Sequence, residues 1–468
     1  MDFTEIYKQS LGLVEPSPTS HAIRGSWVLT AVEDRLIVRR MDTFQVSRSW
    51  LVDNSHSSTS QHLSTQSKSK AGTSGTDGWI THIGWSCDSL YMFACCARRA
   101  IVNVFSLEDE QWNARIESGV EGLIKAEWAP DGRNILCFSE WGLRVTVWSL
   151  VNGCATYIQF PKYPGRGYAF DQDGRQFILA ERHKSKDTIG VYDPNASFKL
   201  LRHFPLPTSS LSSFALSPNG DHIAVWEGPL EYKLYIFNLA GQHLGTFTPE
   251  PDPGLGVRNA AWHPSGNMLA VSGWDDKAGI HILNSLSWTS IAAFELTGRV
   301  PEHVSVWREP PRWIEETHGR GFLSHDQVRA PTSIQIRTGA TGGLIHLEWN
   351  ITGNILLARW ENCPQAVHLY SFPSVPEEFR PRLQTILLHS HPVLSAQWNP
   401  IRAGSLAICC GTGAVYTWVS DKSEEVCECI GVPAKKFSTR DVRWTGDGDG
   451  MALLDKETFC YAFQVLEE

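Results

Sequence analysis

Short apolar runs separated by polar turns recur along the whole 468-residue chain. In each unit an apolar run ends at an anchor residue, usually aromatic, and a turn rich in Pro, Asn, Asp and Gly follows, as in residues 127–132. Such turns reverse the chain because Gly accepts a positive φ and Pro presets φ near −65°. Residues 134–138 and 144–148 then form two arms, and the second alternates polar and apolar positions like a strand with one buried face. The pattern predicts repeated antiparallel hairpins.

The turn recurs with a period of about 45 residues, which is the length of a propeller blade. The anchor residues are Trp85, Trp128, Phe170, Leu216, Trp262, Trp349, Trp398 and Trp444. A degenerate copy at residues 17–39 precedes them, and the long interval before Trp349 indicates an insertion at residues 297–342. We read residues 303–307 and 333–336 of that insertion as outer strands. The sequence thus predicts an all-β propeller of about nine four-stranded blade units over residues 1–468.

The two ends of the chain suggest how the ring closes. Residues 458–466 form a third strand without a fourth, and residues 3–7 form a short alternating segment without a hairpin partner. We expect this N-terminal strand to complete the last blade, because an open ring would expose a strand edge. Propellers usually have four to eight blades. A seven-bladed ring with an annex and two unequal propellers therefore remain alternatives.

Residues 53–78 interrupt the repeat with a Ser- and Thr-rich stretch that contains no Phe, Trp or Tyr. This composition predicts a disordered insertion within the propeller. It is either a plain surface loop or the site of regulatory phosphorylation.

Charge and composition narrow the classes of function. The net charge of −9 provides no surplus positive field for nucleic acid. No apolar stretch approaches the ~18 residues of a membrane helix, and the first residues do not resemble a signal peptide. We therefore expect a cytosolic or nuclear protein without nucleic-acid or membrane partners. The eleven cysteines lack C-x2-C spacing and the histidines lack ligand spacing, which predicts reduced thiols, no metal and no cofactor.

Catalytic motifs are not found in the sequence. It contains no phosphate-cradling loop, nucleophile elbow or H-E-x-x-H helix. Carboxylates at the turns, such as Asp131 and Asp173, fit the simpler role of bonding their own backbone. We predict no catalytic residues, no small-molecule substrate and no enzymatic activity.

The loops between the second and third strands combine aromatic and charged residues. They open on one face of a propeller and here contain Arg98, Arg99, Trp141, Trp274, Asp275 and Trp360. Trp and Arg carry most of the energy at protein interfaces, so these loops predict a partner-binding platform. Packing of Trp141, Trp274 and Trp360 on a neighbouring blade is the alternative.

The repeat resembles the WD-repeat family, although only Tyr192-Asp193 keeps the acidic residue after the third-strand aromatic. Further stretches resemble the WD-repeat-protein-eight subfamily of centrosomes and yeast spindle pole bodies. They are residues 1–6, 144–150, 179–182, 186–187, 200–204, 230–233, 451–454 and 459–460. The first unit and residues 53–78 depart from the pattern.

This resemblance implies a non-enzymatic scaffold in the cytoplasm and cytoskeleton, at the spindle pole body or centrosome. Such a scaffold binds a coiled-coil anchoring protein and, in yeasts, a minus-end-directed kinesin. It anchors microtubule minus ends and controls spindle assembly, length and orientation. In animals the resemblance implies a role in centriole maturation and ciliation. On this resemblance the candidates for partner contact are Glu181, Arg182, Asp187, Glu231, Tyr232 and Lys233. A salt bridge within the ring is the alternative role for the charged ones.

Three other functions remain open. Substrate receptors of ubiquitin ligases carry W-D-x-R, but no arginine follows Trp148, Tyr192 or Trp418 at that spacing. A translation-initiation propeller is disfavoured by the negative net charge. A propeller hydrolase is disfavoured by the absent motifs.

Overall fold

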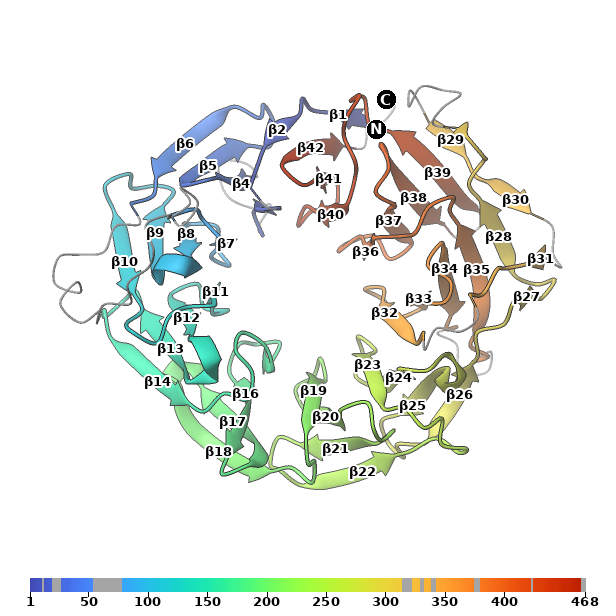
Figure 1. The fold of residues 1–468 in the computed structure, drawn as a ribbon, viewed down its shortest axis with the longest axis horizontal. Coiled ribbons are helices and arrows are strands. Elements are labelled where there is room, and N and C mark those ends of the chain that lie inside the picture. The colour runs from blue at the N-terminus through green and yellow to red at the C-terminus, as the bar shows by residue number, and fades with distance from the viewer. Residues whose placement is uncertain are drawn as a thin grey trace, which may run out of the picture.

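The computed structural model describes residues 1–10, 12–18, 27–53, 78–313, 322–328, 332–337, 342–373, 379–421 and 424–463. These residues form nine blades around a common centre and one separate two-stranded ribbon (Figure 1). The nine-bladed all-β propeller predicted from the repeat is confirmed, and the nine blades of the described residues form one ring, not a seven-bladed ring with an annex or two propellers. The predicted insertion at residues 53–78 lies almost entirely outside the described residues.

Each of the first six blades is an antiparallel sheet of four strands that are consecutive in the chain. Blade one has β3 (Val14–Pro16), β4 (Trp27–Val32), β5 (Arg35–Arg40) and β6 (Val46–Leu51). Blade two has β7 (His82–Trp85), β8 (Tyr91–Cys96), β9 (Ile101–Ser106) and β10 (Asn113–Glu117). Blade three has β11 (Lys125–Trp128), β12 (Asn134–Phe138), β13 (Arg144–Ser149) and β14 (Ala155–Gln159).

Blades four to six continue this arrangement round the ring. Blade four has β15 (Tyr168–Phe170), β16 (Phe177–His183), β17 (Lys186–Asp193) and β18 (Lys199–Pro205). Blade five has β19 (Leu211–Leu216), β20 (His222–Glu227), β21 (Leu234–Asn238) and β22 (His243–Phe247). Blade six has β23 (Val257–Trp262), β24 (Met268–Gly273), β25 (Ile280–Asn284) and β26 (Ser290–Phe294). Four short 3-10 helices are described: η1 (Ala97–Arg99), η2 (Glu140–Gly142), η3 (Pro194–Ala196) and η4 (Asp276–Ala278).

The insertion before Trp349 widens blades seven and eight. Blade seven has β32 (Leu344–Trp349), β33 (Ile355–Trp360), β34 (Ala366–Ser371) and β35 (Arg382–Leu388), and β28 (Ser305–Arg308) and β30 (Asp326–Val328) extend it outward. Blade eight has β36 (Ser395–Trp398), β37 (Ser405–Cys409), β38 (Ala414–Ser420) and β39 (Glu425–Gly431), and β29 (Phe322–Ser324) pairs with β39.

The predicted outer strand at 303–307 overlaps β28. The one at 333–336 overlaps only β31 (Thr332–Ser333), which pairs with β27 (Arg299–Val300) apart from the blades.

The first and the last described strands of the chain meet in blade nine (Figure 1). This blade has β40 (Asp441–Trp444), β41 (Gly450–Leu454) and β42 (Thr458–Phe463). The N-terminal segment adds two short strands, β1 (Asp2–Phe3) and β2 (Tyr7–Lys8), which both pair with β42. The prediction that an N-terminal strand completes the last blade is therefore confirmed, with two short strands in place of one.

The core of the molecule lies between the blades. Nine apolar clusters of buried residues are present, and each joins two neighbouring blades, including blade nine to blade one. Each of the nine blades is thus covered on both faces by its neighbours, and the ring is closed where blade nine meets blade one. Burial of apolar area between sheets is the main stabilising term in such a structure.

Candidate functional site

The connections between second and third strands place the predicted platform residues on one face of the ring. Strands alternate in direction, so the connections from a fourth strand to the next blade open on this same face. We call it the loop face. Arg98 and Arg99 lie in η1, Trp141 in η2, and Trp274 and Asp275 just before η4.

Apolar side chains gather on the loop face at blade three. Trp141 is 87% exposed, and Val120 at 88%, Leu143 at 52% and Phe160 at 54% are also exposed. The loops that carry them are hydrogen-bonded together, Glu140 N to Glu121 O at 3.1 Å and Phe160 N to Leu143 O at 3.3 Å. We call Val120, Trp141, Leu143 and Phe160 the rim patch. Sequence reasoning found only Trp141, because single apolar residues in loops carry no periodic signal.

The backbone at the rim patch is held in a costly conformation. Trp141 has φ of 62° and Phe160 has φ of 60°, in the left-handed region that bulky side chains avoid. Both side chains are nevertheless exposed, so burial in the core does not offset the cost of this backbone conformation. Exposed aromatics in strained loops are typical of binding sites.

The other exposed candidates surround the same face. Arg98, Arg182 and Glu231 are exposed, and Arg99 and Asp275 are half-buried. Arg182 lies directly beside the rim patch, because its backbone N–H donates a hydrogen bond to Phe160 O at 3.0 Å. Two further candidates have interaction partners within the ring. Lys233 pairs with Glu231 at 2.7 Å, and the Arg258 guanidinium lies 4.5 Å from the centre of the half-buried Trp274 ring.

Two candidates are interior residues and are not displayed on the loop face. Trp360 is fully buried in the apolar cluster between blades six and seven. Tyr232 is fully buried between blades five and six, and burial raises the pKa of its hydroxyl. Trp360 therefore packs on a neighbouring blade, which was the alternative role considered for it.

Asp187 is also interior and joins blade four to blade five. Its carboxylate pairs with Lys162 at 2.7 Å and accepts a hydrogen bond from Leu211 N of β19 at 2.6 Å. Both charged side chains are almost completely buried. Burial lowers the pKa of Lys162, and the Asp187 carboxylate acts against this shift. Asp187 therefore makes a salt bridge within the ring, the second of the two roles considered for it.

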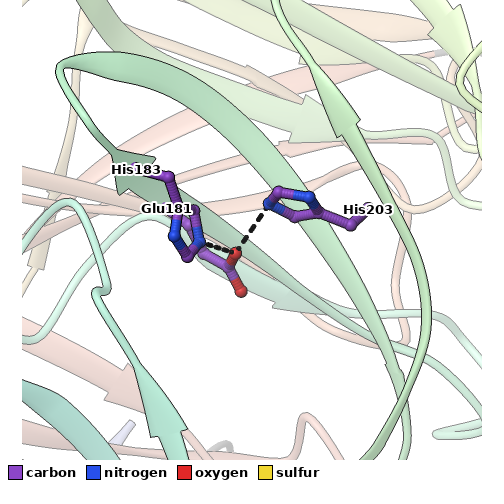
Figure 2. Close-up of side chains that lie close together, drawn as sticks. All are labelled: Glu181, His183 and His203. Atoms are coloured by element: carbon purple, nitrogen blue, oxygen red, sulfur yellow. Dashed lines mark hydrogen bonds and ion pairs between the residues drawn. The ribbon is translucent and has the colours of Figure 1, made fainter.

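Glu181 lies in a cluster with two histidines on blade four (Figure 2). The buried Oε2 of Glu181 lies 2.9 Å from His183 Nε2 and 3.2 Å from His203 Nε2. Its other oxygen, Oε1, accepts a hydrogen bond from the Tyr192 hydroxyl. Burial and the neighbouring Glu181 raise the pKa of that hydroxyl, so it stays protonated and keeps donating.

These three side chains correct one expectation from the sequence. Their ligand atoms all lie within 4.8 Å of one another, and they are the one such group of metal-ligand type found among the described residues. The expectation that the histidines have no ligand spacing is therefore wrong for His183 and His203. The available signal was the Glu-x-His spacing, which places Glu181 and His183 on the same face of a strand. His203 comes from another strand and could not be paired with them from the sequence.

No helix in the described part of the chain has both the length and the apolar character of a membrane span.

No protein-family model matches the chain. It is 30% identical to the mouse WD repeat-containing protein WRAP73 over 492 aligned positions, which cover 100% of this chain and 97% of that protein.

The chain belongs to the WD-repeat family. It is also 21% identical to the uncharacterized WD repeat-containing protein C32H8.09 of Schizosaccharomyces pombe, over 75% of this chain and 72% of that protein. Among solved structures it is similar to the C-terminal WD40 domain of Sif2, with a TM-score of 0.48 and 10% identity over 92% of this chain and 99% of that one. As a WD-repeat propeller the protein is a scaffold for protein interactions.

Proposed function

We propose that this propeller is a non-enzymatic scaffold at the spindle pole body or centrosome. In this role it binds a coiled-coil anchoring protein and, in yeasts, a minus-end-directed kinesin. It thereby anchors microtubule minus ends and controls spindle assembly, length and orientation. The observation that carries the proposal is the resemblance to the spindle-pole subfamily, whose matching stretches run in order from residues 1–6 to residues 459–460. The match of the whole chain to another WD-repeat protein supports treating the ring as one unit.

The rim patch supports a helical partner. Each helix of a coiled-coil protein carries an apolar stripe with charged residues beside it. The rim patch offers Trp141 and Phe160 as aromatic anchors, and the exposed Arg182 lies next to Phe160. An amphipathic helix that lays its apolar stripe on these rings would cover them and meet Arg182 with an acidic side chain.

The test compares two single variants of the full chain, fused to a fluorescent protein in dividing cells. Trp141→Ala removes the largest exposed ring of the loop face. Val151→Ala is the matched control, because Val151 is 77% exposed on the same blade but lies between β13 and β14, on the opposite face. We expect the unsubstituted chain and Val151→Ala to concentrate at spindle poles. Trp141 is the anchor in this scheme, so the signal of Trp141→Ala is expected to become diffuse.

Affinity capture from the same cells identifies the partner. We expect the unsubstituted chain to retain a coiled-coil protein of the microtubule-organising centre and Trp141→Ala to lose most of it. Diffuse signal throughout mitosis, with no such protein captured, would overturn the proposal. Capture of ubiquitin-ligase subunits or ribosomes in its place would support one of the alternative functions. If both variants localise normally, the scaffold role stands and the rim patch is not its contact surface.

A further inference from the structure

We propose that Glu181, His183 and His203 form a binding site for a divalent transition-metal ion of the zinc class. The three side chains offer one carboxylate oxygen and two imidazole nitrogens. The distances from Glu181 Oε2 to the two Nε2 atoms are 2.9 and 3.2 Å. Tetrahedral zinc with bonds of about 2.1 Å separates its ligand atoms by about 3.4 Å, so only small shifts are needed to admit an ion.

The strand register of blade four builds this site. Glu181 pairs with Thr188 on β17, and Gly190 of β17 pairs with His203 on β18. Paired residues share a face of the sheet, so Glu181, His183 and His203 project from the same side. Glu181 and His203 thus come from two strands that are separated by β17.

Gly190 provides the gap through which Glu181 reaches His203. A Cβ at position 190 would overlap the Glu181 carboxylate and the Tyr192 ring. Gly190 lies inside a strand, where glycine is unfavourable and commonly marks a close approach of another group. The group that approaches here is the Glu181 carboxylate, and the Tyr192 hydroxyl fixes its second oxygen.

Burial and exposure in the cluster fit an ion that enters from solvent. The Glu181 side chain is 2% exposed, whereas those of His183 and His203 are 37% and 36% exposed. A buried carboxylate needs a cation or several hydrogen-bond donors to offset its desolvation. Two imidazoles and one carboxylate favour zinc, nickel or copper over magnesium and calcium, which prefer oxygen ligands. Three protein ligands leave one position open for water or for a donor from another molecule.

The site lies next to the proposed contact surface but does not depend on it. The ring of His183 meets the Phe160 ring edge-on, with centroids 5.3 Å apart. A bound ion would therefore stiffen the edge of the rim patch. Metal binding is nevertheless a property of the isolated chain, so its test needs no partner.

The experiment uses the full-length protein, freed of metal by a chelator and then titrated with Zn²⁺ by calorimetry. We expect one binding event that His203→Ala weakens at least about tenfold, because loss of even an outer-shell partner of a metal ligand typically costs about 10–100-fold in affinity. His346→Ala is the matched control. His346 Nε2 lies 3.0 Å from Glu348 Oε2 with the same one-residue spacing, but these two form no three-ligand group among the described residues.

Co²⁺ absorption distinguishes this site from binding by thiols. All eleven cysteines are free, and Cys87 and Cys154 are exposed. Binding at the proposed site gives visible d–d bands without a sulfur-to-cobalt charge-transfer band, and Gly190→Ala should abolish the d–d bands. Circular dichroism checks that both variants fold. The proposal is overturned if the unsubstituted chain does not bind Zn²⁺, if only the thiolate band appears, or if His203→Ala and His346→Ala bind alike. In those cases the cluster is held by hydrogen bonds alone.

Discussion

The indole Nε1 of Trp128 donates a hydrogen bond to the backbone carbonyl of Gly84 at 3.0 Å, and this bond joins blade three to blade two. The same bond recurs at other anchor positions. Trp85, Trp262, Trp349, Trp398 and Trp444 each donate to a carbonyl of the preceding blade. The anchors Phe170 and Leu216 have no side-chain N–H and cannot make it. The repeat of anchor residues is therefore also a repeat of hydrogen bonds that hold the ring together.

Replacing Trp128 by Phe should destabilise the ring modestly. The variant keeps an aromatic ring against Phe93 but leaves the Gly84 carbonyl without its indole donor. A lost hydrogen bond of this kind costs about 1 kcal/mol, and up to about 3 kcal/mol if the carbonyl stays buried and unpaired. The urea midpoint of unfolding measures the loss. Trp50→Phe serves as the control, since no inter-blade hydrogen bond of its indole is found in the described part of the chain. Equal midpoints for the two variants would contradict the role given to Trp128.

Asp187 supplies part of the inter-blade bonding where the tryptophan is missing. Blade five has Leu216 at its anchor, and Asp187 of blade four holds the backbone of Leu211 in that blade. Asp187→Asn would leave the charge of Lys162 buried without its partner. Breaking such a pair from one side costs about 3–5 kcal/mol. We therefore expect a large fall in the urea midpoint, whereas Glu110→Gln, which removes the exposed partner of Arg48, should leave it nearly unchanged.

The Asp187 prediction has an internal check. Replacing both partners, with Asp187→Asn and Lys162→Met together, removes the uncompensated charge. The double variant should recover part of the lost stability, because it is the buried unpaired charge that is costly. A double variant less stable than Asp187→Asn alone would show that the bond to Leu211, and not the ion pair, dominates.

The sequence could predict the ring because the information is local. Each turn, hairpin and anchor residue specifies one blade, and the incomplete last unit specifies how the ring closes. The side-chain environment was not predictable in the same way. Trp141 follows the second strand of blade three and Trp360 ends the second strand of blade seven, each beside an acidic residue. Trp141 is nevertheless 87% exposed, whereas Trp360 is buried by blade packing. Likewise His203 reaches Glu181 only through the register across β17. Contacts between strands depend on register and on the neighbouring blade, which the repeat pattern does not encode.

Acid should destabilise the ring through buried histidines of blade seven and its neighbour. His368 on β34 is 2% exposed, and burial lowers its pKa to about 4 from the usual 6.5. Burial likewise lowers the pKa of His325 to about 4. Between about pH 6.5 and pH 4 these histidines bind more protons in the unfolded chain than in the folded chain. The free energy of unfolding therefore falls as the pH drops from about 6.5 towards 4. At about 1.4 kcal/mol for each pKa unit, His368 alone accounts for roughly 3 kcal/mol at the acid end.

The variant His368→Phe isolates this contribution. It keeps a ring in the buried position but cannot bind a proton, so the loss of stability between pH 6.5 and 4 should become smaller by roughly 3 kcal/mol. His391→Gln is the control, because the His391 side chain is exposed. Urea midpoints are measured at each pH for all three proteins. If His368→Phe and the unsubstituted chain lose stability in parallel on acidification, proton uptake at His368 does not oppose folding, and burial at this position does not keep the imidazole neutral.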